Sequence, residues 1–219
     1  MMTHYVVPTL LAACTAVLIT AVDATAAPQA AAASDTPAVV EVQSGTAAFD
    51  ADTNISAITV HGKSSNVQGR AQIRRTSATL AIDQLEATLP VKTITTGMGL
   101  RDEHMRKYIF TTADGQVPDL RFVSDKAECA AWSSGASNCK VSGQLAIRGL
   151  PRPLAIALTV NQNGDTYRVA GEATVKLSTY GIPQPSQLGV TATDDVKLHL
   201  EFTARPAARL TAARAGDTR

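Results

Sequence analysis

The feature that most constrains the fold is a two-residue alternation of apolar and polar side chains, which recurs along most of the chain after position 39. Such a period is typical of β-strands with one buried face. Turn-forming segments such as residues 161–165 (NQNGD) separate the alternating runs. The sequence therefore predicts an all-β domain of eight or nine antiparallel strands. The apolar positions of three successive runs are Val141, Leu145 and Ile147; Leu154, Ile156, Leu158 and Val160; and Tyr167, Val169, Val175 and Leu177.

One run, residues 79–91, changes phase at Asp83-Gln84, which predicts a β-bulge. Long bulged strands are common in barrels, and closure into a barrel removes exposed sheet edges. Small residues on the inward register would leave space inside an eight-stranded barrel. We therefore favour a barrel with an internal cavity, and a solid β-sandwich with glycines at strand crossings is the alternative. The small inward residues are Gly143, Gly171 and Ala173.

Two segments depart from the alternation. Residues 49–54 (FDADTN) resemble a turn. Residues 98–110 have helical periodicity, with a charged face on which Asp102–Arg106 and Glu103–Lys107 form i,i+4 pairs. We expect one short helix here with its charged face in solvent. The opposite, apolar face carries Leu100, His104, Met105, Tyr108 and Ile109.

The N-terminus resembles a secretory signal. Residues 10–22 are an apolar run too short for a comfortable membrane span, and Ala24-Thr25-Ala26 fits a cleavage site. We expect a signal peptide over residues 1–26 and a flexible leader, rich in Ala, over residues 27–39. The alternatives are a retained membrane anchor and a lipoprotein lipidated at Cys14.

The two remaining cysteines, Cys129 and Cys139, bracket a stretch rich in turn formers. In an oxidising compartment the natural inference is a disulfide across the neck of a hairpin. Two free thiols or metal ligation are the alternatives, and no further ligands at zinc-like spacing lie nearby. The disulfide supports the predicted export to the periplasm or the medium.

The charge pattern argues against nucleic-acid binding. The 219-residue chain has a formal net charge of +1 and 4% aromatic residues, and it has no dense basic patch interleaved with aromatics. Basic residues do recur in the C-terminal tail, residues 205–219. A solvated tail is the simple interpretation, and transient contact with anionic lipid is the alternative. The basic residues of the tail are Arg205, Arg209, Arg214 and Arg219.

The sequence offers little for catalysis or metal binding. His61, His104 and His199 are far apart, and no nucleophile elbow, phosphate loop or dinucleotide fingerprint is present. Asp102, Glu103 and His104 are consecutive, so a helix directs them about 100° apart and they cannot converge on one substrate atom. We therefore predict no metal, no cofactor and no enzyme activity. His104, on the apolar face, is either a core histidine or a polar group beside a cavity.

Two motifs resemble the signature of the YceI-like family over residues 40–204. The resemblance implies an exported, lipocalin-like antiparallel barrel that binds a long apolar chain, such as a polyisoprenoid lipid, without catalysis or metal. Residues 50–56 depart from the family pattern because they lack its opening proline and histidine. The motifs are Met98-x-x-Arg101-Asp102-x-His104-Met105-Arg106 followed by Pro118-x-Leu120-x-Phe122-x-Ser124, and Val141-x-Gly143-x-Leu145-x-Ile147-x-Gly149-x-x-x-Pro153.

These observations predict a carrier that holds an isoprenoid or other amphiphilic lipid in an apolar barrel lumen. Arg101, His104 and Arg148 are the expected polar groups near the opening. The alternatives are an envelope interaction module with a packed barrel and, as a third hypothesis, a small lipid hydrolase or isomerase. The oligomeric state and the ligand's length and headgroup are not predicted. The expected apolar lining is Ile58, Val60, Leu80, Ile82, Leu85, Leu89, Met105, Phe122, Leu145, Ile147, Leu158, Val169, Leu200 and Phe202.

Overall fold

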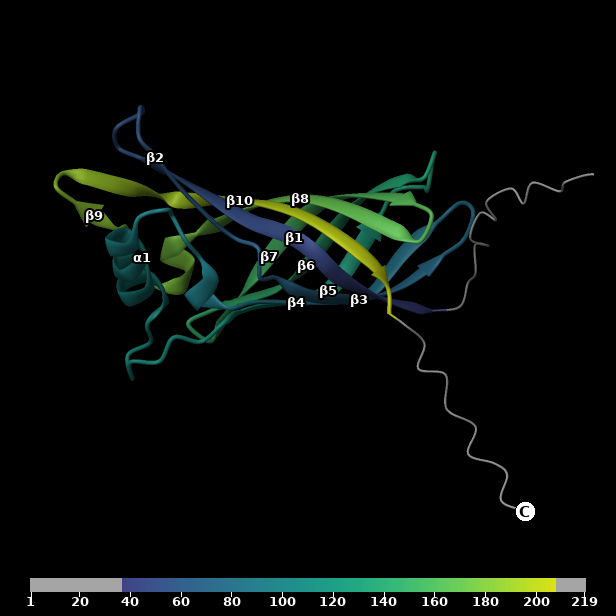
Figure 1. Cartoon of the computed structure of the whole chain (residues 1–219), viewed down its shortest axis with the longest axis horizontal. Helices are drawn as coiled ribbons and strands as arrows, with labels where there is room; N and C mark the ends of the chain where they lie inside the picture. Colours follow the sequence, from purple (N-terminus) through teal and green to yellow (C-terminus); the bar gives the residue numbers. More distant parts are fainter. Residues whose placement is uncertain (1–36, 208–219) are drawn as a thin grey trace, which may run out of the picture. The chain divides into compact units, whose positions relative to one another are not determined.

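A computed structural model describes residues 37–207, which form one antiparallel β-sheet with short helical segments at one end (Figure 1). The predicted signal peptide, most of the predicted leader and most of the basic tail lie outside the described residues. The strands are β1 (Ala38–Thr53), β2 (Thr59–Ser64), β3 (Gln68–Arg75), β4 (Leu80–Leu89), β5 (Leu120–Cys129), β6 (Ala136–Ile147), β7 (Leu150–Asn163), β8 (Thr166–Lys176), β9 (Ser186–Gln187) and β10 (Val190–Pro206). The helical segments are η1 (Val91–Thr93), α1 (Gly99–Met105), η2 (Arg106–Phe110) and η3 (Leu177–Tyr180).

The sheet closes on itself because β1 pairs with β10 along almost its whole length. Of the ten strands, β2 and β3 pair with successive parts of β1 and share one place, and β9 pairs only with β10. Eight strand positions therefore surround the interior, and the predicted eight-stranded barrel is confirmed. Closure pairs the backbone N–H and C=O groups that would lack hydrogen-bond partners at the edge strands of a β-sandwich.

The bulge predicted in β4 is confirmed. Gln72 of β3 faces Gln84, but the next residue, Ile73, faces Ile82, so Asp83 is the extra residue of β4. Its carboxylate accepts two hydrogen bonds from Arg74 on the outer face. The bulge thereby keeps apolar residues on the inner face on both sides of a bend.

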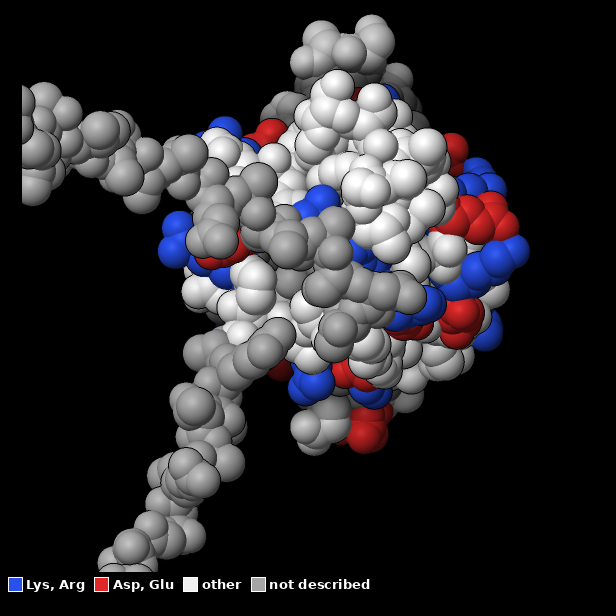
Figure 2. Space-filling model, turned by 90° about the vertical axis from the view of Figure 1, so that its right-hand side faces the viewer, with Lys and Arg blue, Asp and Glu red and all other residues white. Residues whose placement is uncertain are grey.

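Alternate strand connections gather at opposite ends of the barrel. The connections β1–β2, β4–β5, β6–β7 and β8–β10 lie at one end, together with α1, η2 and β9, and we refer to it as the helix end (left in Figure 1). The turns β3–β4, β5–β6 and β7–β8 lie at the other, which we refer to as the disulfide end. Figure 2 views the disulfide end and shows acidic and basic side chains interspersed around its circumference.

At the disulfide end, a disulfide and a tryptophan hold the β5–β6 loop in place. Cys129 and Cys139 face each other across β5 and β6 and form the predicted disulfide. Within the loop that they close, the Trp132 backbone N–H donates to the carbonyl of Ala78 in the β3–β4 turn (2.9 Å). The guanidinium of Arg75 lies 5.7 Å from the centre of the Trp132 ring, a cation–π contact. The loop is thus held on the neighbouring turn.

The helix end is held by a separate group of buried side chains. Val91 of η1 and Phe110 at the end of η2 belong to the core, as does Ile182 after η3. Tyr180 is also buried, and its hydroxyl donates to the carbonyl of Leu145 at 3.0 Å. Burial raises the pKa of Tyr180 to about 12. Within residues 37–207, no helix combines the length and apolar character needed to cross a bilayer.

Three sequence expectations need correction at element boundaries. Residues 49–53 belong to β1 and are not a turn, because Asp50 and Asp52 point outward and find partners on neighbouring strands. The strand begins at Ala38, which pairs with Ile73, so the predicted leader over residues 27–39 ends earlier. At the other terminus β10 continues to Pro206, so Arg205 is part of the barrel and not of the tail.

The predicted helix over residues 98–110 is correct in position but not in form. It consists of α1, which begins at Gly99, and a π-helical turn over η2. The predicted apolar face is divided between the core and solvent. Met105 and Ile109 pack against the core, whereas Leu100 and Tyr108 are exposed.

Candidate ligand-binding cavity

An apolar cavity of about 1250 Å³ lies inside the barrel. This volume exceeds the roughly 300–1,000 Å³ typical of sites for drug-sized ligands. Its wall also includes Leu100, Tyr108 and Leu188, which are exposed at the helix end. The cavity therefore opens to solvent at that end, and the interior is not packed solid as in the predicted interaction module.

The structure brings together all of the predicted ligand-binding residues except Arg148. They come from seven strands, all but β1, β3 and β9, from the β1–β2 connection and from α1, although they are widely separated in sequence. The residues at the cavity wall are Ile58, Val60, Leu80, Ile82, Leu85, Leu89, Arg101, His104, Met105, Phe122, Leu145, Ile147, Leu158, Val169, Leu200 and Phe202.

Arg148 lies near the opening, as expected, but outside the cavity wall. It occupies the left-handed region (φ 55°) in the two-residue turn with Gly149. Its Nε donates to the carbonyl of Ile109 at 2.8 Å, and a terminal nitrogen donates to the carbonyl of Tyr108. The guanidinium therefore satisfies carbonyls at the end of η2. Arg148 positions the helical segment at the opening and is not part of the cavity wall.

Arg101 and His104 provide polar groups at the helix end of the cavity. The Nε of Arg101 donates to Oγ1 of Thr96 (2.9 Å), and a terminal nitrogen donates to the Thr96 carbonyl (2.9 Å). The ring of His104 packs edge-on against Tyr108, with ring centres 5.8 Å apart. Polar groups thus lie beside the opening, and the rest of the wall is mostly apolar, with Arg70 and Glu86 as charged exceptions.

Asp102 is buried, which corrects the prediction that it pairs with Arg106 in solvent. Its carboxylate accepts hydrogen bonds from Oγ1 of Thr95 (2.6 Å) and from the N–H (2.7 Å) and Oγ1 (2.5 Å) of Thr96. Burial alone would raise the pKa of Asp102, but these hydrogen bonds bring it below its usual value. Asp102 therefore anchors α1 to residues 95–96, and it is unavailable as a catalytic partner of His104.

The inward glycines do not create the space that the sequence analysis expected of them. A Cβ atom added to Gly171 would lie 2.7 Å from Cδ2 of Leu158, and one added to Gly143 would lie 2.7 Å from Cζ of Phe122. Neighbouring side chains already fill these positions. The glycines allow large side chains on neighbouring strands to approach closely. This is the role that the β-sandwich alternative gave to them.

The strand prediction missed the wall residue Phe49. Phe49 lines the cavity, and its ring covers Gly62 on β2, where an added Cβ would lie 2.2 Å from ring carbon Cε1. It was missed because residues 49–54 resembled a turn. The alternation of Phe49 and Ala51 with Asp50 and Asp52 was the available signal.

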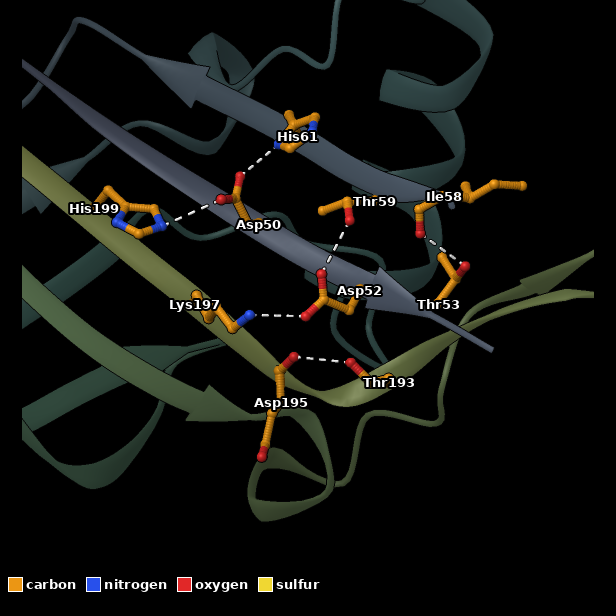
Figure 3. Close-up of polar contacts among 10 residues, drawn as sticks. All are labelled: Asp50, Asp52, Thr53, Ile58, Thr59, His61, Thr193, Asp195, Lys197 and His199. Carbon is orange, nitrogen blue, oxygen red and sulfur yellow. Dashed lines mark hydrogen bonds and ion pairs between the residues drawn. The ribbon is translucent and has the colours of Figure 1, made fainter. Parts of the chain in front are cut away.

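The three histidines within residues 37–207 also divide between surfaces. On the outer wall, Asp50 of β1 lies between His61 of β2 and His199 of β10 (Figure 3). Its oxygens lie 2.6 Å from Nδ1 of His61 and 3.2 Å from Nε2 of His199. The hydrogen bond with His61 is the main cause of the lowered pKa of Asp50. No group of three or more His, Cys, Asp or Glu residues within 37–207 is arranged to hold a metal ion.

The fold and cavity define a class of closed antiparallel barrels with an apolar interior that opens at one end. The family model for the YceI-like domain matches residues 36–204, which is more than half of the chain. The protein therefore belongs to the YceI-like family, as its motifs indicated. A comparison with curated protein sequences finds no match.

Solved structures share this fold at low sequence identity. BcnA from Burkholderia cenocepacia is 19% identical with a TM-score of 0.55, and the match covers 73% of this chain and 95% of BcnA. A polyisoprenoid-binding domain from Saccharophagus degradans is 12% identical with a TM-score of 0.55, covering 77% and 98%. A mutant YceI protein from Campylobacter jejuni with a monobromobimane guest is 18% identical with a TM-score of 0.50, covering 67% and 84%. At these identities the likeness establishes the fold.

Proposed function

We propose that the protein is a non-enzymatic carrier that holds one long apolar chain, isoprenoid or acyl, inside the barrel. The observation that carries this proposal is the large apolar cavity that opens at the helix end. Burial of apolar surface contributes about 25 cal/mol per Å² before the costs of ordering the ligand. An extended hydrocarbon fits such a lumen because its wall offers few polar partners.

The polar groups beside the opening suggest how the ligand lies. Of the ionisable side chains of α1, those of Arg101 and His104 lie at the cavity wall. We place the chain in the lumen and the headgroup near these two side chains. The Saccharophagus degradans domain named for polyisoprenoid binding supports the choice of an isoprenoid as first candidate.

We further propose that the protein acts outside the cytoplasm. Disulfides persist in the periplasm and other oxidising compartments, and Cys129 and Cys139 are joined in the structure. The apolar run over residues 10–22 and the cleavage pattern at Ala24-Thr25-Ala26 point the same way.

The test is direct analysis of the purified protein for bound lipid. Protein purified without detergent is extracted with organic solvent, and the extract is analysed by mass spectrometry. We expect a co-purifying isoprenoid or acyl lipid, and uptake of a fluorescent fatty-acid or prenyl probe by delipidated protein. Repeated absence of both would contradict the carrier function.

A further inference from the structure

Large exposed apolar side chains are confined to one end of the barrel. Within residues 37–207 each of them lies in a helix-end connection or, for Leu150, at the first residue of β7, and the three turns of the disulfide end contribute none. Isolated exposed apolar residues are normal on protein surfaces, but a cluster at one place indicates an interaction site. We define the apolar rim as Ile55, Ile58, Met98, Leu100, Tyr108 and Leu188.

The apolar rim is continuous with the cavity wall. Ile58, Met98, Leu100, Tyr108 and Leu188 are exposed to solvent and also line the cavity. An apolar molecule could therefore pass from outside to the lumen along a continuous apolar surface. The rim thus has a role in the proposed carrier function, on which this inference rests.

Two hairpin tips of the rim are uncharged and held together. Residues 54–58 (NISAI) and 183–189 (PQPSQLG) contain no charged side chain. Nδ2 of Asn54 donates to the carbonyl of Gly189 (3.1 Å), and the N–H of Thr191 donates to Oδ1 of Asn54 (2.8 Å). The tips therefore present Ile55 and Leu188 as one surface, without the charges that usually keep exposed loops in water.

Leu188 is the least expected residue of the rim. It is 97% exposed and lies in the left-handed region (φ 51°), followed by Gly189 (φ 81°), in the turn between β9 and β10. Such two-residue turns favour Asn, Asp or Gly at this position, because Gly has no Cβ atom and the short polar side chains of Asn and Asp tolerate the left-handed region, whereas most other side chains are strained there. Neither packing within the chain nor turn geometry accounts for a leucine. Contact with an apolar phase outside the protein does.

We propose that the apolar rim docks on the surface of a phospholipid bilayer, so that the ligand passes between membrane and lumen without crossing water. The exposed side chain of Tyr108, with Nζ of Lys107 at 5.3 Å from its ring centre, suits the boundary between acyl chains and phosphates. An apolar rim around an opening can insert into a fluid surface, whereas a rigid protein partner requires a continuous complementary face. The bilayer is also the source of a membrane lipid.

Vesicle flotation with the Leu188→Asn variant tests this proposal. The vesicles are phosphatidylcholine, with and without phosphatidylglycerol. We expect the wild-type protein to float with both kinds and Leu188→Asn to partition at least about tenfold less. Because Asn tolerates the left-handed region, the variant should unfold at the same or a higher temperature. The control Ala78→Asp adds a charge to an exposed turn at the disulfide end and should float like the wild type.

The outcomes separate docking from carriage. Equal flotation of Leu188→Asn and wild type, or flotation that requires phosphatidylglycerol and disappears at high salt, would overturn docking through the rim. Wild-type protein that takes up a fluorescent fatty-acid probe in solution but never floats would overturn docking and leave the carrier function standing. Wild-type protein that floats through Leu188 but takes up no probe would support docking and contradict the carrier function.

Discussion

The two ends of the barrel are built differently from the same alternating strands. At the disulfide end a covalent bond joins β5 to β6, and Trp132 is held between Arg75 and the β3–β4 turn. At the helix end the connections are held by buried side chains such as Val91 and Ile182, by hydrogen bonds that Asp102 accepts and by those that Arg148 donates, while Leu100 and Tyr108 remain exposed. The disulfide thus lies at one end of the barrel, and the cavity opening lies at the other. Local opening is expected first at the helix end, whose anchors are non-covalent.

Of the changes that test this difference between the two ends, removal of the disulfide should have the largest effect on the free energy of unfolding. We predict that Cys129→Ala combined with Cys139→Ala lowers the free energy of unfolding by about 3 kcal/mol, because the short loop is no longer constrained in the unfolded chain. Chemical denaturation of the oxidised wild type and of the variant measures this difference. A loss below about 1 kcal/mol would show that the cross-link does not stabilise the closed end. Thiol labelling of denatured, unreduced wild type should find neither cysteine free.

At the helix end the strongest anchor is Asp102. We predict that Asp102→Ala lowers the free energy of unfolding by about 2 kcal/mol, because Thr95 and Thr96 lose their acceptor. Hydrogen exchange over residues 95–110 should accelerate, while exchange in β6 and β7 should not. The matched control Glu103→Ala, at an exposed position of the same helix, should change stability by less than about 0.5 kcal/mol.

Acidification should mimic the loss of this anchor. The lowered pKa of Asp102 means that its ionised form stabilises the fold above the unfolded value of about 3.9. This contribution disappears as the pH falls through the folded pKa. Protection from exchange over residues 95–110, corrected for the intrinsic pH dependence of amide exchange, should therefore fall below about pH 4 in the wild type but show a weaker pH dependence in Asp102→Ala. An equal fall in both proteins would contradict the assignment.

A smaller effect is expected from Tyr180, whose hydroxyl bonds the Leu145 carbonyl. We predict that Tyr180→Phe lowers the free energy of unfolding by about 1 kcal/mol at neutral pH. Because the folded pKa is about 12 and the unfolded value is about 10, the unfolded chain loses its proton first. Wild-type stability should therefore decline between about pH 10 and 12 from this group. The same titration of Tyr180→Phe should lack that component.

The smallest effect on the free energy of unfolding should come from a substitution on the outer wall. We predict that Asp50→Asn changes the free energy of unfolding by no more than about 1 kcal/mol, because His61 and His199 are largely exposed. The lowered pKa of Asp50 places its contribution above about pH 4, with loss on further acidification. Probe uptake into the lumen should remain unchanged, and a clear loss of uptake would link this cluster to the cavity.

The sequence predicted those parts of the molecule that depend on local pattern. The alternation identified most strands, the phase slip identified the bulge at Asp83, and the cysteine spacing identified the disulfide. The prediction failed where a polar residue binds a partner that is distant in sequence. Asp50 and Asp52 resembled turn residues because their ion-pair partners, His199 and Lys197, lie on β10 and could not be identified from the local sequence. Arg148 resembled a ligand-binding cation because its acceptors in η2 cannot be inferred from spacing.

The cavity wall was easier to predict than the features around its opening. Inward positions follow from strand periodicity, so the apolar lining could be proposed residue by residue. The π-helical turn, the burial of Asp102 and the exposure of Leu188 arise from how four separate connections meet at the helix end. Those features decide which side chains a ligand would pass, and they required the structure.

The most direct test of the account is a titration of a fluorescent long-chain fatty-acid probe into three delipidated proteins: wild type, Ala87→Phe and Ala155→Phe. Ala87 lines the cavity, whereas Ala155 is exposed on the outer face of β7. Because the two variants add the same ring on opposite faces of the wall, only Ala87→Phe should fill the lumen. We predict at least about a tenfold loss of probe affinity for Ala87→Phe and none for Ala155→Phe. Equal affinity of Ala87→Phe and wild type would contradict a ligand site inside the barrel.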